Sequence, residues 1–336
     1  MKHEQALKDT AKALVAPGKG LLAADESSAT AGKRLTAVGL ESTAEVRRSY
    51  RQLLLTTKGI EQYLSGVILF DETIRQSNDA GKSFVACLQD EGIIPGIKVD
   101  AGAKDLALHP GEKVTEGLDG LRERFAAYAK LGARFAKWRA VITIGDNIPS
   151  DACLHANSHA LARYSALAQE AGIVPIVEPE VLLDGNHSIE QCYAVTAETL
   201  DALFAQLEEQ GVMLEGLILK ASMVLSGKDA PDRANVPTVA AQTVKCLKEH
   251  VPASVAGVVF LSGGQGEEEA TAHLDAMNKL GDLPWPLTFS YSRAIQNPVL
   301  KLWAAGDAEK AAAAYLHRCE ANSLAAKGEW SEAFEA

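Results

Sequence analysis

The chain has 336 residues, 47% of them hydrophobic and 23% charged, and carries a net charge of -11. A chain of this length can bury a sizeable core as one large domain or two smaller ones. The excess of acidic residues argues against an extended surface for nucleic acid or an anionic membrane, although a local cluster of lysines can still bind a phosphorylated small molecule.

The first residues and the cysteines predict a soluble, cytoplasmic protein. Residues 1–20 are amphipathic and charged, without the apolar core of a secretory signal, and no window is apolar enough to span a membrane. The five cysteines are far apart and form no C-x-x-C pair, which is typical of free thiols rather than a disulfide framework.

Eight short segments rich in aliphatic residues predict buried strands. In chain order they are LLAADES from Leu21, GVILF from Gly66, IIPGIKVD from Ile93, RFAKWRAVI from Arg134, IVPIVEPE from Ile173, GLILKASMV from Gly216, VAGVVFLSGG from Val255 and LTFSYSRA from Leu287. Between them, apolar residues recur at spacings of three and four, which predicts amphipathic helices over residues 118–133, 157–172, 193–211 and 237–251.

This alternation predicts the fold. Near-continuous apolar strands that alternate with amphipathic helices indicate a parallel sheet covered by helices. Eight such units in one chain predict an α/β fold, a (β/α)8 TIM barrel with extra helices at the N- and C-termini. No linker or change in composition divides the sequence, so we expect a single domain over residues 1–336, in which residues 301–336 form a C-terminal helix and short tail.

Polar or ionisable residues follow the predicted strands at their C-terminal ends. They are Asp25, Glu26 and Ser27; Asp71; Lys98 and Asp100; Lys137 and Arg139; Glu178 and Glu180; Lys220 and Ser222; Ser262; and Ser290 and Arg293. Barrel enzymes build their active sites at this end of the strands. Because side chains alternate along a strand, residues two apart can point into the barrel together. The alternative is a structural network of ion pairs, which perturbs pKa values without catalysis.

Lys220 is unusual because it interrupts the apolar strand GLILK, where an ammonium group is costly to bury. Burial and a second ammonium nearby both favour the free amine, which attacks carbonyl carbon to form a Schiff base. Lys137 and Lys98, on the fourth and third predicted strands, can reach the same barrel mouth. Glu178, on the strand between those of Lys137 and Lys220, is placed to move the protons that Schiff-base formation requires.

A phosphate site is predicted after the last two strands. Ser262, Gly263 and Gly264 directly precede a predicted helix, where backbone N–H groups bind anions. Arg293 can clamp the same phosphate, and these two loops are the usual phosphate site of such barrels. A plain turn before a helix is the alternative for the glycines, and no P-loop or dinucleotide fingerprint occurs.

A metal site is not predicted, and no cofactor is expected. His155 and His159 lie four residues apart on a predicted helix and could share a face, but no third ligand is close to them in the sequence.

Seven segments also carry a specific resemblance. LLAADES, GIKVD, FAKWR, IVEPE, ILKxxMV, FLSGGQxEEEA and FSYxRA resemble class I fructose-1,6-bisphosphate aldolase and occur in that family's order, from about Ala16 to about Lys327. The resemblance implies a (β/α)8 lyase of glycolysis and gluconeogenesis, active as a homotetramer on sugar phosphates. Such an enzyme splits fructose 1,6-bisphosphate reversibly into dihydroxyacetone phosphate and glyceraldehyde 3-phosphate through a lysine Schiff base.

The resemblance also implies roles for individual residues. Lys220 would attack the ketose carbonyl, Glu178 would move protons with Lys137 and Glu180 beside it, and Asp25 would take the C4 hydroxyl proton. The remaining matched positions bind substrate: Ser262, Gly263, Gly264 and Arg293 the C1 phosphate, Ser27, Thr30, Arg34 and Lys98 the far end of the substrate, and Arg139 and Ser290 further parts of the site.

The chain departs from the family pattern at several positions. Ala221 and Ser222 stand where eukaryotic members have Pro-Asn, Thr30 stands for a serine, and Ser292 replaces a glycine whose N–H meets phosphate. A positive φ at Ser292 would cost more than at glycine. The sequence ends in SEAFEA, without the C-terminal tyrosine that in many members assists proton transfer at the enamine carbon, so we expect that transfer to be slower or to use another group.

Two other functions stay open on the sequence alone. One is a Schiff-base lyase or transferase for a different phosphorylated sugar, such as sedoheptulose bisphosphate. The other is a non-catalytic binding or scaffold role that retains the barrel, and the presence of Asp25, Lys137, Glu178 and Lys220 together argues against it.

Overall fold

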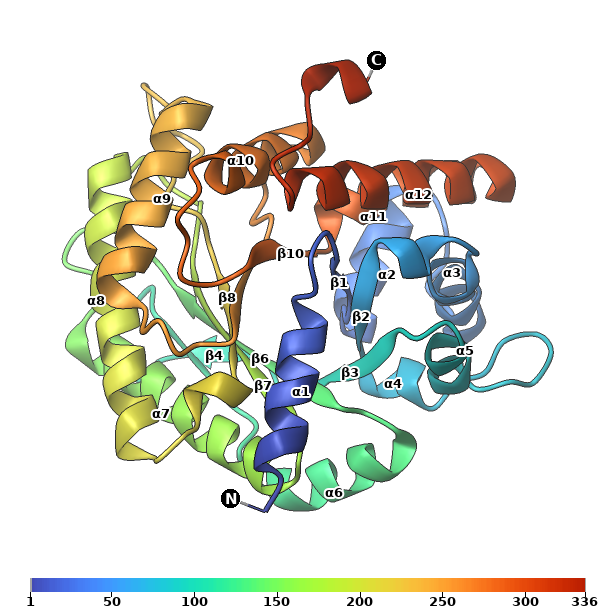
Figure 1. The fold of residues 1–336 in the computed structure, drawn as a ribbon, viewed down its shortest axis with the longest axis horizontal. Coiled ribbons are helices and arrows are strands. Elements are labelled where there is room, and N and C mark those ends of the chain that lie inside the picture. The colour runs from blue at the N-terminus through green and yellow to red at the C-terminus, as the bar shows by residue number, and fades with distance from the viewer. Residues whose placement is uncertain (1, 336) are drawn as a thin grey trace.

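The computed structural model describes residues 2–335, and its centre is a closed barrel of eight parallel strands (Figure 1). In their order around the barrel, the strands are β1 (Gly20–Ala24), β10 (Leu287–Tyr291), β9 (Gly257–Phe260), β8 (Ile218–Ala221), β7 (Val174–Val181), β6 (Phe135–Ile142), β3 (Ile94–Lys98) and β2 (Leu64–Leu69). Each of the eight predicted strand segments overlaps one of them, so the predicted fold class is confirmed.

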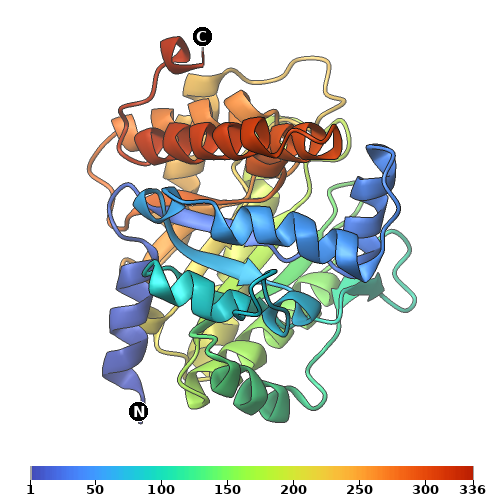
Figure 2. The ribbon, with the colours of Figure 1, turned by 90° about the vertical axis from the view of Figure 1, so that its right-hand side faces the viewer.

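Helices cover the outside of the barrel (Figures 1 and 2). They are α2 (Ser28–Ala37), α3 (Ala44–Thr56), α4 (Asp71–Ile74), α5 (Phe84–Asp90), α6 (Leu121–Leu131), α7 (Asp151–Glu170), α8 (Ile189–Glu209), α9 (Val236–His250), α10 (Glu267–Lys279), α11 (Arg293–Ala304) and α12 (Ala308–Ala325), with single 3₁₀ turns at Ile60–Gln62, Leu214–Gly216 and Glu332–Phe334. A short antiparallel hairpin of β4 (Ala103–Asp105) and β5 (Lys113–Thr115) follows β3.

Two helix starts differ from the predicted ones by four residues or more because caps set them. Helix α7 begins six residues before the predicted start, since the side chain of Ser150 accepts a hydrogen bond from the Cys153 N–H. Helix α8 begins at Ile189, after a capping box of Ser188 and Gln191.

The C-terminal boundary was also wrong. Lys301 lies inside α11, so the extra C-terminal segment begins only after Gly306, where α12 starts and packs on α10 and α11.

The interior of the barrel is apolar at the N-terminal ends of the strands and charged at their C-terminal ends. On β7, every second residue faces into the barrel. Val174 and Ile176 therefore contribute to the apolar end, and Glu178 and Glu180 on the same strand contribute to the charged end. Helix α1 (Glu4–Leu14) lies across the N-terminal end of the barrel in Figure 1, and its Leu7 packs in the same apolar cluster. Helix α1 therefore covers part of the apolar end, and the charged end opens into a cavity among the strand ends.

Gly96 on β3 makes this interior possible. A Cβ atom at this position would lie 2.3 Å from the ring of Phe135, which fills the barrel. The close approach therefore requires a residue without a side chain.

Candidate active site

A cavity of about 570 Å³ opens at the C-terminal ends of the barrel strands. It is lined by Ala23, Asp25, Glu26, Ser27, Thr30, Phe70, Lys98, Asp100, Ala101, Gly102, Ala103, Lys137, Arg139, Glu178, Glu180, Lys220, Leu261, Ser262, Gly263, Ser290, Ser292 and Arg293. Of the strand-end residues that the sequence singled out, all but Asp71 and Ser222 line this cavity.

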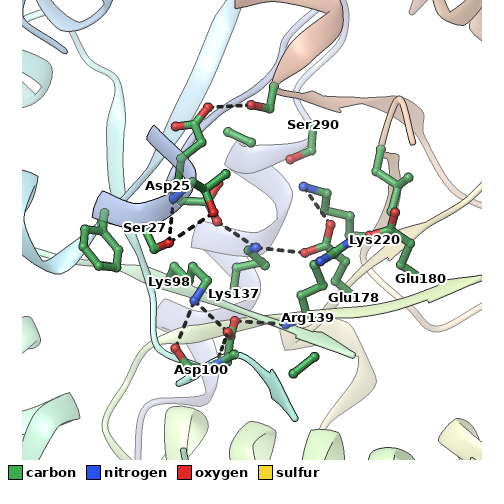
Figure 3. Close-up of a pocket in the computed structure, with 18 of the residues that line it drawn as sticks. Asp25, Ser27, Lys98, Asp100, Lys137, Arg139, Glu178, Glu180, Lys220 and Ser290 are labelled. Carbon is green, nitrogen blue, oxygen red and sulfur yellow. Dashed lines mark hydrogen bonds and ion pairs between the residues drawn. The ribbon is translucent and has the colours of Figure 1, made fainter. Parts of the chain in front are cut away.

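A chain of ion pairs crosses the floor of this cavity (Figure 3). Lys137 Nζ lies 2.7 Å from Asp25 Oδ2 and 2.9 Å from Glu178 Oε2, and Lys220 Nζ lies 3.1 Å from Glu178 Oε1. The Glu178 carboxylate therefore lies between the side-chain nitrogens of two lysines. Lys220 is buried, as predicted, but it lies against a carboxylate and not in purely apolar surroundings.

These contacts determine the charges of the buried groups. Burial by itself raises the pKa of Asp25, but the positive charges of Lys137 and Lys220 outweigh burial and lower that pKa to about 2. Burial likewise opposes a charged Glu178, and the same two lysines hold its pKa below the usual value. Burial lowers the pKa of Lys137, yet Asp25 and Glu178 raise it well above its ordinary range. Both carboxylates are thus ionised at neutral pH, and Lys137 is an ammonium.

A second set of pairs forms one wall of the cavity. Lys98 Nζ lies 2.6 Å from Asp100 Oδ1 and also donates to the Asp100 carbonyl at 3.0 Å. Asp100 Oδ2 accepts from the backbone N–H of Arg139 at 3.2 Å, and the Arg139 guanidinium pairs with Glu180. Glu180 and Arg139 are therefore held as a pair beside the floor of the cavity.

The predicted phosphate loops meet at the opposite wall. Gly263 and Gly264 have φ values of 56° and 97°, a backbone conformation that favours glycine, and α10 begins three residues later. A Cβ atom at Gly264 would lie 3.6 Å from the Arg293 guanidinium, which places Arg293 beside this turn. Gly264 itself does not line the cavity.

Two serines complete this wall. The Ser290 hydroxyl is buried and has no hydrogen-bond partner among residues 2–335, so it can bond to a ligand in the cavity. Ser292 has a φ of -110°, so the strain that the sequence suggested for a non-glycine residue at this position does not occur.

The residues expected at the far end of the substrate lie in different places. Ser27 caps α2 by accepting from the Thr30 N–H at 3.3 Å, and both residues line the cavity with Lys98. Arg34 lies on α2 beside the cavity without lining it, and it pairs with Glu26.

Three polar residues that line the cavity, Glu26, Asp100 and Ser292, had no role predicted from the sequence. Asp100 and Glu26 were recognised as polar strand ends, and their spacing from Lys98 and Asp25 was the available signal. Ser292 was noted only as a departure from a family pattern. The contacts of Glu26 with Arg34 and Arg51, and of Ser292 with Arg34, had no sequence signal.

No group of three potential ligands that could hold a metal ion occurs among residues 2–335. His155 and His159 lie on α7, as predicted, with their side chains exposed, and His159 bonds to Gln206 of α8. Within the same range no helix is long and apolar enough to cross a membrane.

This chain is similar in sequence to known proteins over most of its length. The family described as "Glycolytic: Fructose-bisphosphate aldolase class-I" matches residues 6–336. A probable fructose-bisphosphate aldolase class 1 of Xanthomonas campestris pv. campestris is 59% identical over 96% of this chain and 98% of its own length. Fructose-bisphosphate aldolase 4, cytosolic, of Arabidopsis thaliana is 50% identical over 93% of this chain and 80% of its own.

A solved structure with the same fold as this chain is also an aldolase. Fructose-bisphosphate aldolase of Plasmodium falciparum, crystallised with TRAP and a small-molecule inhibitor, superimposes with a TM-score of 0.96 at 48% identity, over 98% of this chain and 96% of the other. The chain belongs to the class I fructose-bisphosphate aldolase family.

Proposed function

We propose that this protein is a lyase that cleaves fructose 1,6-bisphosphate reversibly into dihydroxyacetone phosphate and glyceraldehyde 3-phosphate, a step of glycolysis and gluconeogenesis, with Lys220 as the Schiff-base nucleophile. Family membership supports the reaction. The cavity geometry supports the residue roles, because the side chains that this chemistry needs share one floor.

Schiff-base formation uses Lys220 and Glu178. The free amine of Lys220 adds to the C2 carbonyl carbon of the open-chain ketose. Glu178 carries one proton from the nitrogen of the adduct to its alkoxide oxygen, which gives the carbinolamine. It then delivers a second proton, taken up from solvent, to the carbinolamine hydroxyl, which leaves as water and produces an iminium ion. Lys137 stabilises the Glu178 carboxylate throughout, since it contacts the oxygen that Lys220 does not.

Carbon–carbon cleavage then uses Asp25. Its carboxylate takes the proton of the C4 hydroxyl, the C3–C4 bond breaks, and the electron pair of that bond moves towards the iminium nitrogen to form an enamine. Glyceraldehyde 3-phosphate leaves with C4 as its aldehyde carbon. The enamine gains a proton at C3, and this balances the proton that Asp25 took from the C4 hydroxyl and passes on. Addition of water then releases dihydroxyacetone phosphate, returns Lys220 to the free amine and gives back to solvent the proton used in iminium formation.

The phosphate groups would be bound at two ends of the cavity. Ser262, Gly263, Gly264 and Arg293 are assigned to the C1 phosphate, where left-handed glycines, a helix N-terminus and a guanidinium come together. Ser27, Thr30, Lys98 and Arg34 are assigned to the far phosphate, and Ser290 and Arg139 to the sugar between them.

The observation that carries this function is the bridging Glu178 carboxylate. Lys220, Lys137 and Glu178 each have only 4% of their side chains exposed, and Asp25 has 11%. Keeping two buried lysines with two buried carboxylates is expensive unless the site uses them.

Borohydride trapping tests the proposal. The protein is incubated with dihydroxyacetone phosphate, reduced, digested and analysed by mass spectrometry, alongside Lys220→Met and a control, Lys228→Met, whose side chain is 52% exposed outside the cavity. We expect an adduct on Lys220 in the wild type and the control, none in Lys220→Met, and cleavage of fructose 1,6-bisphosphate that withstands a metal chelator. Absence of any adduct in folded wild-type protein contradicts the mechanism, and an adduct on another lysine contradicts the assignment of Lys220.

We also propose that residues 1–336 form one cytoplasmic domain that assembles as a homotetramer. One barrel with a continuous core supports a single domain, and five buried, unpaired cysteines agree with a reducing compartment. The tetramer rests on the family resemblance, and light scattering coupled to size exclusion tests it: a monomer mass near 35.7 kDa would contradict it.

A further inference from the structure

The cationic side chains that line the cavity are nearly all neutralised. Lys98 pairs with Asp100, Lys137 with Asp25 and Glu178, Lys220 with Glu178, and Arg139 with Glu180. Among residues 2–335, Arg293 is the lining cation that has neither an ion pair nor a side-chain hydrogen bond. A substrate with one phosphate therefore finds a free cation, whereas a second phosphate must take its cation from an existing pair.

Arg34 is held beside the cavity mainly by one ion pair. Its Nη1 pairs with Glu26, but its other hydrogen bonds, to Ser292, Gln296 and Asn297, are all 3.4–3.5 Å long. Its Nη1 lies 3.4 Å from the hydroxyl of Ser292, which lines the cavity, so a small movement brings the guanidinium to the cavity. Lys98, by contrast, is bound by both the carboxylate and the carbonyl of Asp100.

The other arginine on Glu26 is not free to move. Arg51 lies 2.7 Å from Glu26 Oε2, has 5% of its side chain exposed, and also donates to the Ala24 carbonyl. It therefore remains on Glu26 when Arg34 leaves.

Release of Arg34 leaves the Glu26 carboxylate at the cavity wall, where an unsatisfied negative charge would repel a phosphate. Glu26 Oε1 keeps two other donors, the hydroxyl of Ser292 at 2.8 Å and the amide of Gln296 at 3.0 Å. Both come from α11 or its cap, next to Arg293. The Ser292 hydroxyl thus compensates Glu26 at the position that Arg34 would vacate.

We propose that Ser292 is a positioning residue for the second phosphate: its hydroxyl holds Glu26 so that Arg34 can turn to the far phosphate, and this favours bisphosphate over monophosphate ketoses. The inference rests on the proposed aldol cleavage and deepens it. Without the hydroxyl, Glu26 holds Arg34 more firmly and repels phosphate more strongly, and both effects weaken the binding of a substrate with two phosphates more than that of a substrate with one.

Steady-state kinetics on two substrates test this role. We measure kcat and KM for fructose 1,6-bisphosphate and fructose 1-phosphate in the wild type, Ser292→Ala and Ser292→Thr, with Ser331→Ala, an exposed serine outside the cavity, as the matched control. Loss of one hydrogen bond to a charged group predicts a rise of about ten-fold in the KM for the bisphosphate in Ser292→Ala, with kcat and the monophosphate KM within about two-fold. Ser292→Thr keeps the hydroxyl and is expected to resemble the wild type.

A double-mutant cycle assigns the effect to Arg34. In an Arg34→Ala background, Ser292→Ala is expected to cause no further rise in the bisphosphate KM. An equal rise for both substrates, no rise at all, or a full additional rise in the Arg34→Ala background overturns the proposal. Failure of the wild type to cleave either sugar phosphate instead overturns the proposed function.

Discussion

Replacement of Lys137 by methionine tests the electrostatics of the cavity floor most directly. Methionine fills similar space and removes the ammonium that contacts Asp25 at 2.7 Å and Glu178 at 2.9 Å. At an effective dielectric constant of about 20, a unit charge at 2.7 Å from Asp25 is worth about 6 kcal/mol, or about four pKa units. Water penetration and relaxation reduce this effect, so we expect the pKa of Asp25 to rise from about 2 by at least about two units.

A higher pKa of Asp25 lowers kcat at acidic pH. Asp25 acts as a base only while ionised, so activity is lost as the pH falls through its pKa. In the wild type the pKa of about 2 keeps this loss below the range in which the protein is assayed. In Lys137→Met we expect an acidic limb in the pH profile of kcat at about pH 4 to 6, and a fall in kcat of about 100-fold or more at neutral pH.

The assay is the pH dependence of kcat for fructose 1,6-bisphosphate cleavage in wild type, Lys137→Met and Lys137→Arg. Lys137→Arg retains the charge, so it is expected to keep the acidic limb of the wild type. Trapping with dihydroxyacetone phosphate should still label Lys220 in Lys137→Met, which shows that the site is folded. An acidic limb that does not move in Lys137→Met would refute the electrostatic role assigned to Lys137.

Two further predictions concern stability. Gly96→Ala places a methyl group 2.3 Å from the Phe135 ring and should lower the free energy of unfolding in urea by about 1–3 kcal/mol; an unchanged value would show that the ring can move aside. Glu335→Gln weakens a contact with Arg318, whose side chain is 5% exposed, and should lower Tm measurably while kcat stays unchanged; Glu329→Gln, at an exposed position, is the control, and equal Tm values in both variants would contradict the prediction.

The strand and helix pattern was readable from the sequence because it is local. Apolar runs such as GVILF mark strands that are buried on both faces, and the spacing of Lys137 and Arg139 shows that both can face inward. Helix starts were less accurate, since a cap such as Ser150 acts through one hydrogen bond that leaves the apolar period unchanged.

The partners of the charged residues could not be read in the same way. The sequence places Asp25, Lys137, Glu178 and Lys220 at strand ends, but only closure of the barrel brings Lys137 between Asp25 and Glu178. An ion pair forms where distance and burial allow, and neither is a property of the local sequence.

The sequence by itself determined that this chain forms a (β/α)8 barrel and that polar residues gather at the C-terminal strand ends, and it predicted Lys220 as the candidate nucleophile. These conclusions follow from periodicity and from residue order, which are fixed along the chain. The tertiary structure alone decided that Glu178 lies between the side chains of Lys137 and Lys220, that Arg34 is held beside the cavity by Glu26, and that Arg293 has no ion pair within residues 2–335. The reason is that a charge acts over a few ångströms of space, and the fold chooses which distant residues share that space.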